Sequence, residues 1–572
     1  MKSNIKYIIL AILMLNVTNT FAQERENDSI DGGTVNVVKA YTPAISDAFK
    51  IKEIPSLNDA STIKKKEIKY TIFSIPVAST FTPAKGKAAT VDKEKSVKLY
   101  DNYASLGVGT YTTILGEVYL NHAISRTERV GSYFSHHSSS GDVEGINFDN
   151  NFSETGLNAH YSQKLRDYSW KVEGGFQLQR FNWYGLQDQE VAVFDVDHSF
   201  YSANIGGNIK FDDAIFKDGS VLFRRFGDDQ DSGENRFLLK TGFDVPVADE
   251  VIKTEVTIDY LGGSFDKNYF VNEALNYSNI IFGLAPSYQM KRDDLTLNLG
   301  VNLVYVNDTE ASDGRFFIYP NITASYRLVD ELLIAYGSIE GGLNQNSYYD
   351  FAQENPFVSP TLFIVPTDQA YNASVGVKGK LSNSMSYNVN GRYSAENNRA
   401  LFRSNAAIGD GGENYQFGNS FGIAYDDVKT FAIGGELNVD INRNFKLGLK
   451  ADYFAYNTEN EAEAWNLPDI EASAFLDIQI DEHWFAGANL FFVGERKDVL
   501  NIGTTADLSF DMIPVTLKSY FDANAHVGYK ITDQLSAFAK ANNIANQSYN
   551  RWVNYPVQGI QFLAGATYQF DF

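Results

Sequence analysis

The last fifteen residues, Gln558–Phe572, alternate between apolar and polar side chains so regularly that they constrain the fold of the whole chain. Every even position from Ile560 to Phe572 is apolar, and the odd positions are mostly polar, with Leu563 as the clear exception. Successive side chains of a β-strand point to opposite faces, so the segment predicts a long strand with one apolar face. Such a face must be covered by a protein core or by lipid.

The same alternation recurs from Leu99 to the C-terminus and predicts a chain of long strands. In the late strands the period of two is clearest, as in the segments 429–441, 445–457 and 516–530. We expect 22 strands, at residues 102–110, 114–123, 129–138, 150–163, 168–183, 195–210, 219–228, 234–245, 251–265, 275–290, 294–307, 315–327, 331–342, 369–380, 384–396, 429–441, 445–457, 467–480, 483–496, 516–530, 534–546 and 558–571.

The connections between these strands alternate between short turns and mostly long loops. The short turns include residues 166–167, 291–293, 329–330, 382–383, 442–444, 481–482 and 532–533. The long loops include residues 139–149, 184–194, 343–368, 397–428, 497–515 and 547–557. Long strands with tight turns at one end and long loops at the other are typical of outer-membrane barrels, whereas a soluble sandwich needs neither feature. The predicted fold class is therefore all-β, a transmembrane antiparallel outer-membrane β-barrel of about 22 strands.

The barrel's outward positions are expected to meet outer-membrane lipid. The apolar faces of the last strand and of the segment 445–457 place Ile560, Phe562, Leu447 and Leu449 outward, with polar side chains lining the lumen.

Composition excludes several classes of function. The chain of 572 residues has no cysteine, so it has neither disulfides nor thiolate metal sites. Its net charge of −23 argues against a nucleic-acid partner, because neutralising phosphates requires a basic face. Aromatic residues make up 14% of the chain, which suits a β-rich, aromatic-rich wall.

The N-terminus predicts export. Lys2 and Lys6 precede the apolar run 7–15, and small residues at Thr20 and Ala22 offer a cleavage site. This arrangement is typical of a secretory signal peptide, and the run is too short for a membrane-spanning helix. We therefore expect a signal peptide at residues 1–22, a periplasmic tail at 23–98 and the barrel at 99–572.

The tail differs from the barrel in charge. Residues 23–98 carry 13 basic and 10 acidic side chains, whereas residues 99–572 carry 33 basic and 61 acidic ones. Two short stretches of the tail have strand-like composition: residues 70–75, and the segment Thr34, Val35, Asn36, Val37 and Val38. Either stretch could pair with the exposed edge of a partner's sheet, or remain an extended peptide without a partner.

The sequence gives only weak evidence for catalytic or metal-binding residues. The adjacent His136 and His137 point to opposite faces of a strand and make a poor shared metal site. His198 follows two aspartates, but the spacing does not distinguish a catalytic group from a lumen wall. The acidic stretch Asp228 to Glu234 lacks the ligand ladder of a calcium loop and is interpreted as a solvated surface loop. We expect no enzyme activity, no metal and no cofactor.

Residues 520–572 resemble the closing strands of TonB-dependent receptors. The matching pieces are Gly528-Tyr529-Lys530, Asn542-Asn543-Ile544, Gln547-Ser548-Tyr549, Tyr555-Pro556 and the final strand ending in Phe572. The resemblance implies uptake of a bulky nutrient and a TonB-type energy-coupling partner, with Thr34–Val38 in the position of the coupling segment. It also implies that the terminal aromatic residues Tyr568, Phe570 and Phe572 close the barrel and are read by the barrel-assembly machinery.

Two functions remain open at this stage. In that family a plug domain fills the barrel, and it is larger than the 76 residues of the predicted tail. The chain is either a transporter whose plug is reduced or supplied by a plug-bearing partner, or a non-transporting barrel that acts as a structural or assembly partner of an outer-membrane complex. Aromatic residues of the long loops could stack on a ligand or pack loop against loop: Tyr348, Tyr349, Phe351, Phe357 and Trp465.

Overall fold

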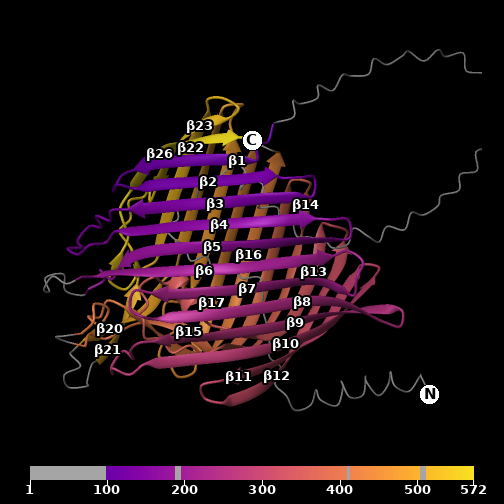
Figure 1. The fold of residues 1–572 in the computed structure, drawn as a ribbon, viewed down its shortest axis with the longest axis horizontal. Helices are drawn as coiled ribbons and strands as arrows, with labels where there is room; N and C mark the ends of the chain where they lie inside the picture. Colours follow the sequence, from indigo (N-terminus) through magenta and orange to yellow (C-terminus); the bar gives the residue numbers. More distant parts are fainter. Residues whose placement is uncertain (1–97, 187–194, 409–411, 443, 503–510) are drawn as a thin grey trace, which may run out of the picture. The chain divides into compact units, whose positions relative to one another are not determined.

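The computed structural model describes residues 98–572, apart from residues 187–194, 409–411, 443 and 503–510 (Figure 1). The expected signal peptide at 1–22 and the tail segment Thr34–Val38 lie outside the described residues.

Twenty-two strands form one antiparallel sheet. They are β1 (Asn102–Gly109), β2 (Ile114–Ala123), β3 (Glu128–Ser139), β4 (Phe152–Lys164), β5 (Tyr168–Asn182), β6 (Asp197–Phe211), β7 (Phe216–Asp228), β8 (Gly233–Val247), β9 (Glu250–Phe265), β10 (Leu275–Arg292), β11 (Leu295–Asp308), β12 (Asp313–Val329), β13 (Leu333–Asn344), β14 (Thr367–Ser382), β15 (Met385–Ser404), β16 (Phe421–Asn442), β17 (Phe445–Thr458), β18 (Ile470–Gln479), β19 (Trp484–Val493), β22 (Tyr520–Lys530), β23 (Leu535–Asn542) and β26 (Gln561–Phe570). Each of the 22 predicted strands overlaps one of these, so the predicted fold class is confirmed.

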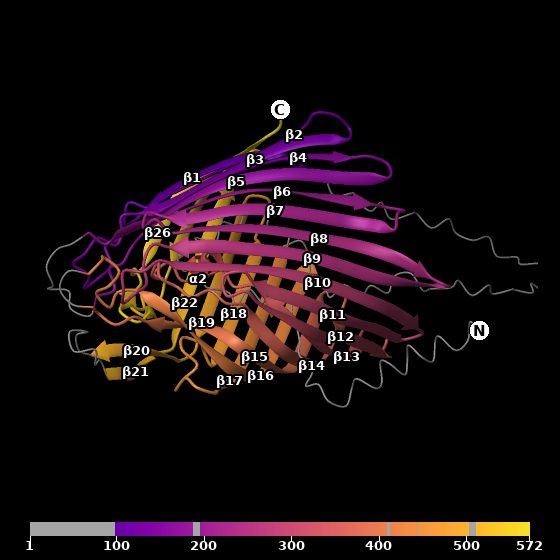
Figure 2. The same ribbon diagram turned by 60° about the horizontal axis from the view of Figure 1, so that its bottom comes forward.

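Every barrel strand pairs with its neighbour in sequence, and the last pairs with the first (Figures 1 and 2). β26 lies antiparallel to β1 over eight residue pairs, from Asn102 opposite Phe570 to Gly109 opposite Leu563. The sheet is therefore a closed meander without a free edge, which is what a sheet in lipid requires, because unpaired backbone groups there are costly.

The two ends of the barrel differ as expected. At the end that holds β1's first residue and the C-terminus, which we call the turn end, the connections contain two to four residues. At the opposite, long-loop end they contain four to 26 residues. Asp293 and Asp330 shape two of the tight turns with φ of 50° and 40°, a left-handed conformation that aspartate tolerates better than most residues.

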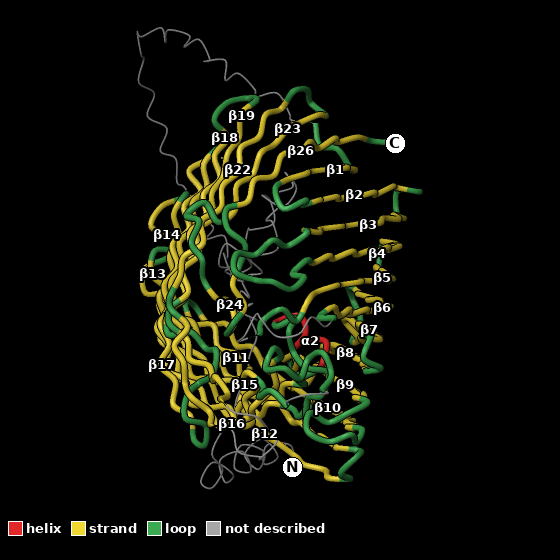
Figure 3. Tube along the Cα trace, turned by 90° about the vertical axis from the view of Figure 1, so that its left-hand side faces the viewer, coloured by secondary structure: helices red, strands yellow, loops and turns green. Residues whose placement is uncertain are grey.

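The remaining elements lie in connections at the long-loop end. The helix α2 (Tyr348–Glu354) lies between β13 and β14, and Figure 3 shows it inside the ring of strands. Two small hairpins, β20 (Arg496–Ile502) with β21 (Asp511–Leu517) and β24 (Asn550–Trp552) with β25 (Tyr555–Pro556), belong to the connections that precede β22 and β26. Among the described residues no helix is long and apolar enough to cross a membrane.

One predicted loop was too long. Residues 397–428 were expected as a loop, but β15 continues to Ser404 and β16 begins at Phe421, so the connection is 405–420. The prediction was wrong because both strands continue beyond the stretch in which one face is consistently apolar. Their pairing persists there past a register shift between Glu396 and Arg399.

Alternation along the strands sorts side chains into an outward and an inward face. In β11 the even positions Val304 and Val306 pack into a buried cluster, whereas the odd positions Leu299 and Tyr305 are 44% and 42% exposed. Of the residues expected outward, Phe562 and Leu449 are 53% and 39% exposed, and Leu447 is half-buried on the same face as Leu449. Ile560 precedes β26 and is half-buried.

The closing seam depends on the absence of side chains at two glycines. Gly107 and Gly565 are direct partners in β1 and β26. A Cβ atom on Gly565 would lie 2.2 Å from the carbonyl oxygen of Leu106 and 2.6 Å from the ring of Phe538. The carbonyl oxygen of Leu106 cannot move without disturbing the pairing of the two strands, so larger residues at Gly565 would force the seam apart.

A disulfide can test this seam. Ser105 Oγ lies 2.9 Å from Thr567 Oγ1 across the β1–β26 pair, and the natural chain has no cysteine to compete. We expect the double variant Ser105→Cys/Thr567→Cys to form a disulfide in the membrane and to resist unfolding on heating in detergent. The control Ser105→Cys/Gln569→Cys is offset by two residues on the same face. Equal cross-linking of both pairs would contradict the register.

A second test concerns the lipid-facing side. Leu299→Arg places a charge on the outward face of β11, whereas Asn298→Arg places it on the inward face of the same strand. We expect Leu299→Arg to lower the free energy of unfolding by about 2–4 kcal/mol near mid-bilayer, and Asn298→Arg to lower it far less. Urea unfolding in lipid vesicles measures both. Similar losses would show that the two faces are not distinct environments.

Candidate functional site at the long-loop end

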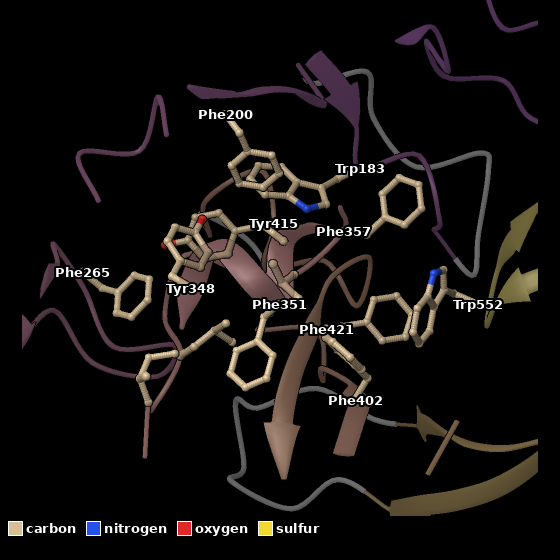
Figure 4. Packing of buried hydrophobic residues seen from close by; sticks show 14 of the residues in the cluster. Trp183, Phe200, Phe265, Tyr348, Phe351, Phe357, Phe402, Tyr415, Phe421 and Trp552 are labelled. Atoms are coloured by element: carbon tan, nitrogen blue, oxygen red, sulfur yellow. The ribbon is translucent and has the colours of Figure 1, made fainter. Parts of the chain in front are cut away.

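Buried aromatic side chains from the long connections meet inside the barrel wall at the long-loop end. We call this cluster of 21 buried residues the loop core; Figure 4 shows part of it. Its members come from the wall strands, from α2 and from the long connections: Trp183, Phe200, Phe226, Leu261, Phe265, Tyr269, Tyr277, Tyr348, Phe351, Ala352, Phe357, Val358, Leu362, Ile364, Phe402, Tyr415, Phe421, Leu517, Trp552, Val553 and Tyr555.

Ring stacking joins connections that are far apart in sequence. The rings of Phe357 and Tyr555 stack with centroids 3.8 Å apart, and the rings of Trp183 and Tyr415 meet edge to face at 5.5 Å. Tyr184 donates to the carbonyl of Pro556 at 3.1 Å. Full burial of one such side chain contributes roughly 1.5–3 kcal/mol, so the connections hold one another in place without needing regular secondary structure.

α2 is the one helix in this cluster and has clear local start and stop signals. Ser347 caps its first turn, since its hydroxyl accepts from the Asp350 N–H at 3.1 Å. Pro356 follows two residues after the last helical residue and cannot extend the helix. Tyr348, Phe351 and Ala352 form the buried face, while Asp350 remains 46% exposed at its side chain.

Two buried carboxylates of the barrel wall bind the start of α2. Glu234 in β8 accepts from the backbone N–H of Tyr348 at 2.6 Å and from the hydroxyl of Tyr277 at 2.9 Å. Asp228 in β7 accepts from the Tyr348 hydroxyl at 2.7 Å. Both carboxylates are almost fully buried, at 1% and 4% exposure. A hydrogen bond contributes about 0.5–1.5 kcal/mol to stability, and leaving a buried polar group without its partner costs more, so these contacts anchor the helix.

Two arginines of the same part of the barrel wall also lie beside α2. Arg224 in β7 lies 3.7 Å from Glu234 and stacks over the Tyr349 ring at 3.7 Å. Arg236 in β8 makes a two-pronged ion pair with Asp259 in β9, at 2.9 and 2.6 Å. The wall below α2 is thus charged but locally compensated.

The structure places the predicted loop aromatics within the protein. Tyr348, Phe351 and Phe357 belong to the loop core at 1%, 5% and 9% exposure, and Tyr349 packs against it. Trp465 lies apart, in a smaller cluster with Leu401, Val428 and Val499. In this structure these side chains therefore pack against other parts of the protein, as in the second of the two alternatives for the loop aromatics.

The expectation for the acidic stretch Asp228 to Glu234 is wrong in part. Asp228 and Glu234 were interpreted as members of a solvated loop, but they are buried inward-facing residues at the ends of β7 and β8. Burial is possible because backbone N–H groups and tyrosine hydroxyls satisfy their oxygens. Among the described residues no group of three or more acidic or histidine side chains is arranged to hold a metal ion.

The chemical importance of Arg224, Arg236, Asp259 and Asp350 was not recognised in the sequence. The contacts of Arg224 and Arg236 with α2 and its cap join positions more than 100 residues apart, which no local pattern reveals. The sequences of the strands do contain one indication of these ion pairs. Opposite charges at inward positions of consecutive strands suggest internal ion pairing rather than a bare lumen wall.

The predicted terminal residues lie on the last strand or just after it. Tyr568 and Phe570 share the outward face of β26 and stack at 5.8 Å. Phe572 follows the strand, is 76% exposed and packs against the ring of His122. Pairing of β26 with β1 confirms that the final strand closes the barrel.

A further buried carboxylate holds the β20–β21 hairpin to the wall. Asp498 is 0% exposed and accepts from the N–H of Ser404 at 3.1 Å and of Val499 at 2.8 Å. Burial raises the pKa of Asp498 to about 6, although these hydrogen bonds act in the opposite direction.

The raised pKa predicts a stability that depends on pH. The folded state binds the Asp498 proton more tightly than the unfolded state does, so stability should rise as the pH falls from about 6 toward about 4. The gain cannot exceed roughly 3 kcal/mol for a shift of about two pKa units. We expect Asp498→Asn to remove this part of the pH dependence in thermal unfolding. Asp330→Asn, at an exposed turn, is the control. An unchanged pH dependence in Asp498→Asn would refute the assignment.

Solved structures share this architecture at low sequence identity. The FrpB iron transporter from Neisseria meningitidis, F5-1 variant in its apoprotein form, superposes with a TM-score of 0.61 at 11% identity, covering 83% of this chain and 81% of that one. The ferripyoverdine receptor of the outer membrane of Pseudomonas aeruginosa gives 0.58 at 13% identity, covering 84% and 73%. The ferric-catecholate import receptor Fiu from E. coli K12 gives 0.58 at 11% identity, covering 82% of each chain.

No protein-family model matches the sequence, and no curated protein does. The likeness therefore concerns the fold. The described part of the chain has the 22-stranded barrel of TonB-dependent receptors.

Proposed function

We propose, from the barrel fold that the chain shares with TonB-dependent receptors, that the protein resides in the outer membrane and takes up a bulky nutrient. A 22-stranded barrel has a lumen wide enough for a large solute and too wide to be left open in a permeability barrier. The three structural neighbours named above are described as an iron transporter, a ferripyoverdine receptor and a ferric-catecholate import receptor, which supports uptake as the function.

The observation that carries this proposal is the closed 22-stranded barrel, and the loop core occupies its long-loop end. Connections from several parts of the sequence meet inside the barrel wall at the long-loop end and bury their aromatic rings together. In the proposal they are an extracellular gate. Five aromatic residues are buried or half-buried while the gate is closed, Trp465 in its own small cluster, and become available to stack on the nutrient when it opens: Tyr348, Tyr349, Phe351, Phe357 and Trp465.

The N-terminal tail supplies the energy coupling in this proposal. Residues 23–98 would lie in the periplasm, and Thr34–Val38 would add a strand to a TonB-type protein, since β-augmentation needs only a short extended peptide. The tail's surplus of positive charge, against a strongly acidic barrel segment, also supports a sealing role at the periplasmic end. A plug-bearing partner would fill the same role from another chain.

Assembly in the outer membrane is assigned to the C-terminus. Tyr568, Phe570 and Phe572 supply an aromatic end to the closing strand. We propose that the barrel-assembly machinery reads this end.

The alternative function is a non-transporting barrel within an outer-membrane complex. The depth of burial in the loop core favours it: Trp183, Tyr348 and Tyr555 are each only 1% exposed. A core of this kind suits a permanent closure as well as a gate.

A disulfide lock separates the two functions. Val358, in the connection between β13 and β14, and Phe421, at the start of β16, form a β-bridge. Bridged backbones lie about 5 Å apart, within reach of a disulfide. The matched control is Ala407→Cys/Phe417→Cys, a bridge within the single connection 405–420 that ties no two connections together.

We expect Val358→Cys/Phe421→Cys to abolish growth of the native host on one nutrient supplied as the limiting source, with recovery on reduction, and the control to grow normally. Iron chelates, cobalamin, oligosaccharides and peptides are supplied one at a time. Normal growth of the locked strain on every source would reject uptake of those nutrients. Co-purification of a stable outer-membrane partner would then favour the alternative.

Deletion of Glu24–Lys93 behind the signal peptide tests the tail. We expect normal amounts of heat-modifiable barrel but the same growth defect as the lock. A large single-channel conductance and sensitivity to bulky antibiotics, found only in the deletion, would identify the tail as a seal. Unchanged growth, conductance and antibiotic resistance would remove the tail from both roles.

A further inference from the structure

Arg224 and Arg236 are direct cross-strand partners on the inward face of β7 and β8. Like charges in this position repel each other and destabilise a sheet unless anions lie between or beside them. Both side chains are largely buried, at 11% and 16% exposure, so water screens the repulsion only weakly. The pair therefore marks a place where the protein wall requires negative charge.

Each arginine has one buried carboxylate partner of its own. Arg224 lies 3.7 Å from Glu234, and Arg236 lies 2.6 Å from Asp259, with side-chain exposures of 1% and 8% for the two acids. Glu234 also holds the start of α2, and Asp259 meets Arg236 with both oxygens. These two acids are permanent parts of the wall.

A third carboxylate bridges the two arginines from the other side. Asp350 of α2 lies 3.9 Å from Arg224 and 3.3 Å from Arg236, one oxygen toward each. Unlike the wall acids it is 46% exposed and belongs to a connection rather than to the barrel. The Nε atom of Arg224 is buried and has no hydrogen-bond partner, so the site's donors are not fully used.

We propose that Arg224 and Arg236 form a luminal binding site for an anionic ligand, and that Asp350 occupies it as a tethered substitute. The ligand class is one that offers two oxygens of a carboxylate or phosphate group to two neighbouring guanidinium groups, as Arg pairs bind such groups best. When such a ligand enters, it takes the position of Asp350 and breaks the ion pairs that join α2 to the two arginines, which loosens the helix while the Glu234 and Asp228 contacts of Tyr348 remain.

Asp350 lies in the first turn of α2, which explains why its displacement by an anionic ligand would loosen the start of the helix. Its Oδ2 accepts from the Ser347 hydroxyl at 2.5 Å, and Arg224 donates to the same hydroxyl at 3.2 Å. A ligand that displaces Asp350 therefore also removes the carboxylate that accepts from the hydroxyl of Ser347, the residue that caps the helix. This site deepens the proposed function by naming a ligand class, and for its use in uptake it rests on that function.

Asp350→Asn is the first test, made on the purified full-length barrel in detergent. The variant keeps the size of the side chain but removes the competing charge. Calorimetric titration with citrate and, separately, with inorganic phosphate should show binding roughly tenfold or more tighter than to the wild type, because a neutral amide competes for the two guanidinium groups less strongly than a carboxylate does. If only citrate binds more tightly, the site is specific for carboxylates. If only phosphate binds more tightly, the site is specific for phosphates.

Two variants control this measurement. Asp231→Asn removes an exposed acid from the connection between β7 and β8 and should bind as the wild type does. Asp350→Asn/Arg236→Gln should lose the gain. Equal tightening in Asp231→Asn would mean that net charge alone acts, and an Asp350→Asn variant that binds neither anion while remaining heat-modifiable would overturn the site.

Movement of α2 has an independent readout in the otherwise wild-type chain. Ala352 is 2% exposed on the buried face of α2, and the protein has no other cysteine, so Ala352→Cys reports when this face opens. Saturating citrate or phosphate should speed its reaction with a maleimide several-fold, and Arg236→Gln should abolish the effect. A rate that neither anion changes would overturn the loosening of α2. Neither test depends on uptake, so failure of the proposed function would leave both results intact.

Discussion

The need to pair every strand edge in lipid determines the rest of this structure. Backbone groups without partners are too costly in a bilayer, so the sheet must close on itself, and here it does so through β26 and β1. Closure depends on small details, such as the two glycines that face each other across the seam and the Phe538 ring that covers Gly565. Once 22 strands have closed, a wide lumen follows automatically, and with it the problem of what occupies its mouth.

The chain meets that problem with ordinary protein packing at the long-loop end. The long connections form a hydrophobic core of their own, and the barrel wall contributes both apolar and charged side chains to it. α2 is too short to be stable by itself, because helices of this length lack sufficient hydrogen bonds. It persists because Glu234 and Asp228 accept from its first residue and because its apolar face enters the loop core. The same wall concentrates two arginines, so anchoring and charge recognition occupy one place.

The strands could be predicted from the sequence and the loop core could not, for physical reasons. A wall with lipid on one side and a polar lumen on the other imposes a period of two, which is visible in segments such as 445–457 without any partner. The same rule fails at the long-loop end, where β15 and β16 continue beyond their predicted ends. Tyr348 and Phe357 were identified as candidates, but their neighbours were not, because contacts such as Tyr348 with Asp228 span 120 residues. The sequence does not indicate the burial of Asp228 and Glu234 for the same reason, because the tyrosine groups that donate hydrogen bonds to these carboxylates lie far away in the sequence.

Amide hydrogen exchange measured by mass spectrometry tests most directly whether wall carboxylates hold the loop core in place. The comparison is between the wild type and Glu234→Ala, with peptides from α2 and from the distant strands β15 to β19 read in the same experiment. Our account predicts slow exchange in residues 348–354 of the wild type and fast exchange in the variant, with the distant strands unchanged. Equally slow exchange of α2 in both proteins, or fast exchange already in the wild type, would contradict it.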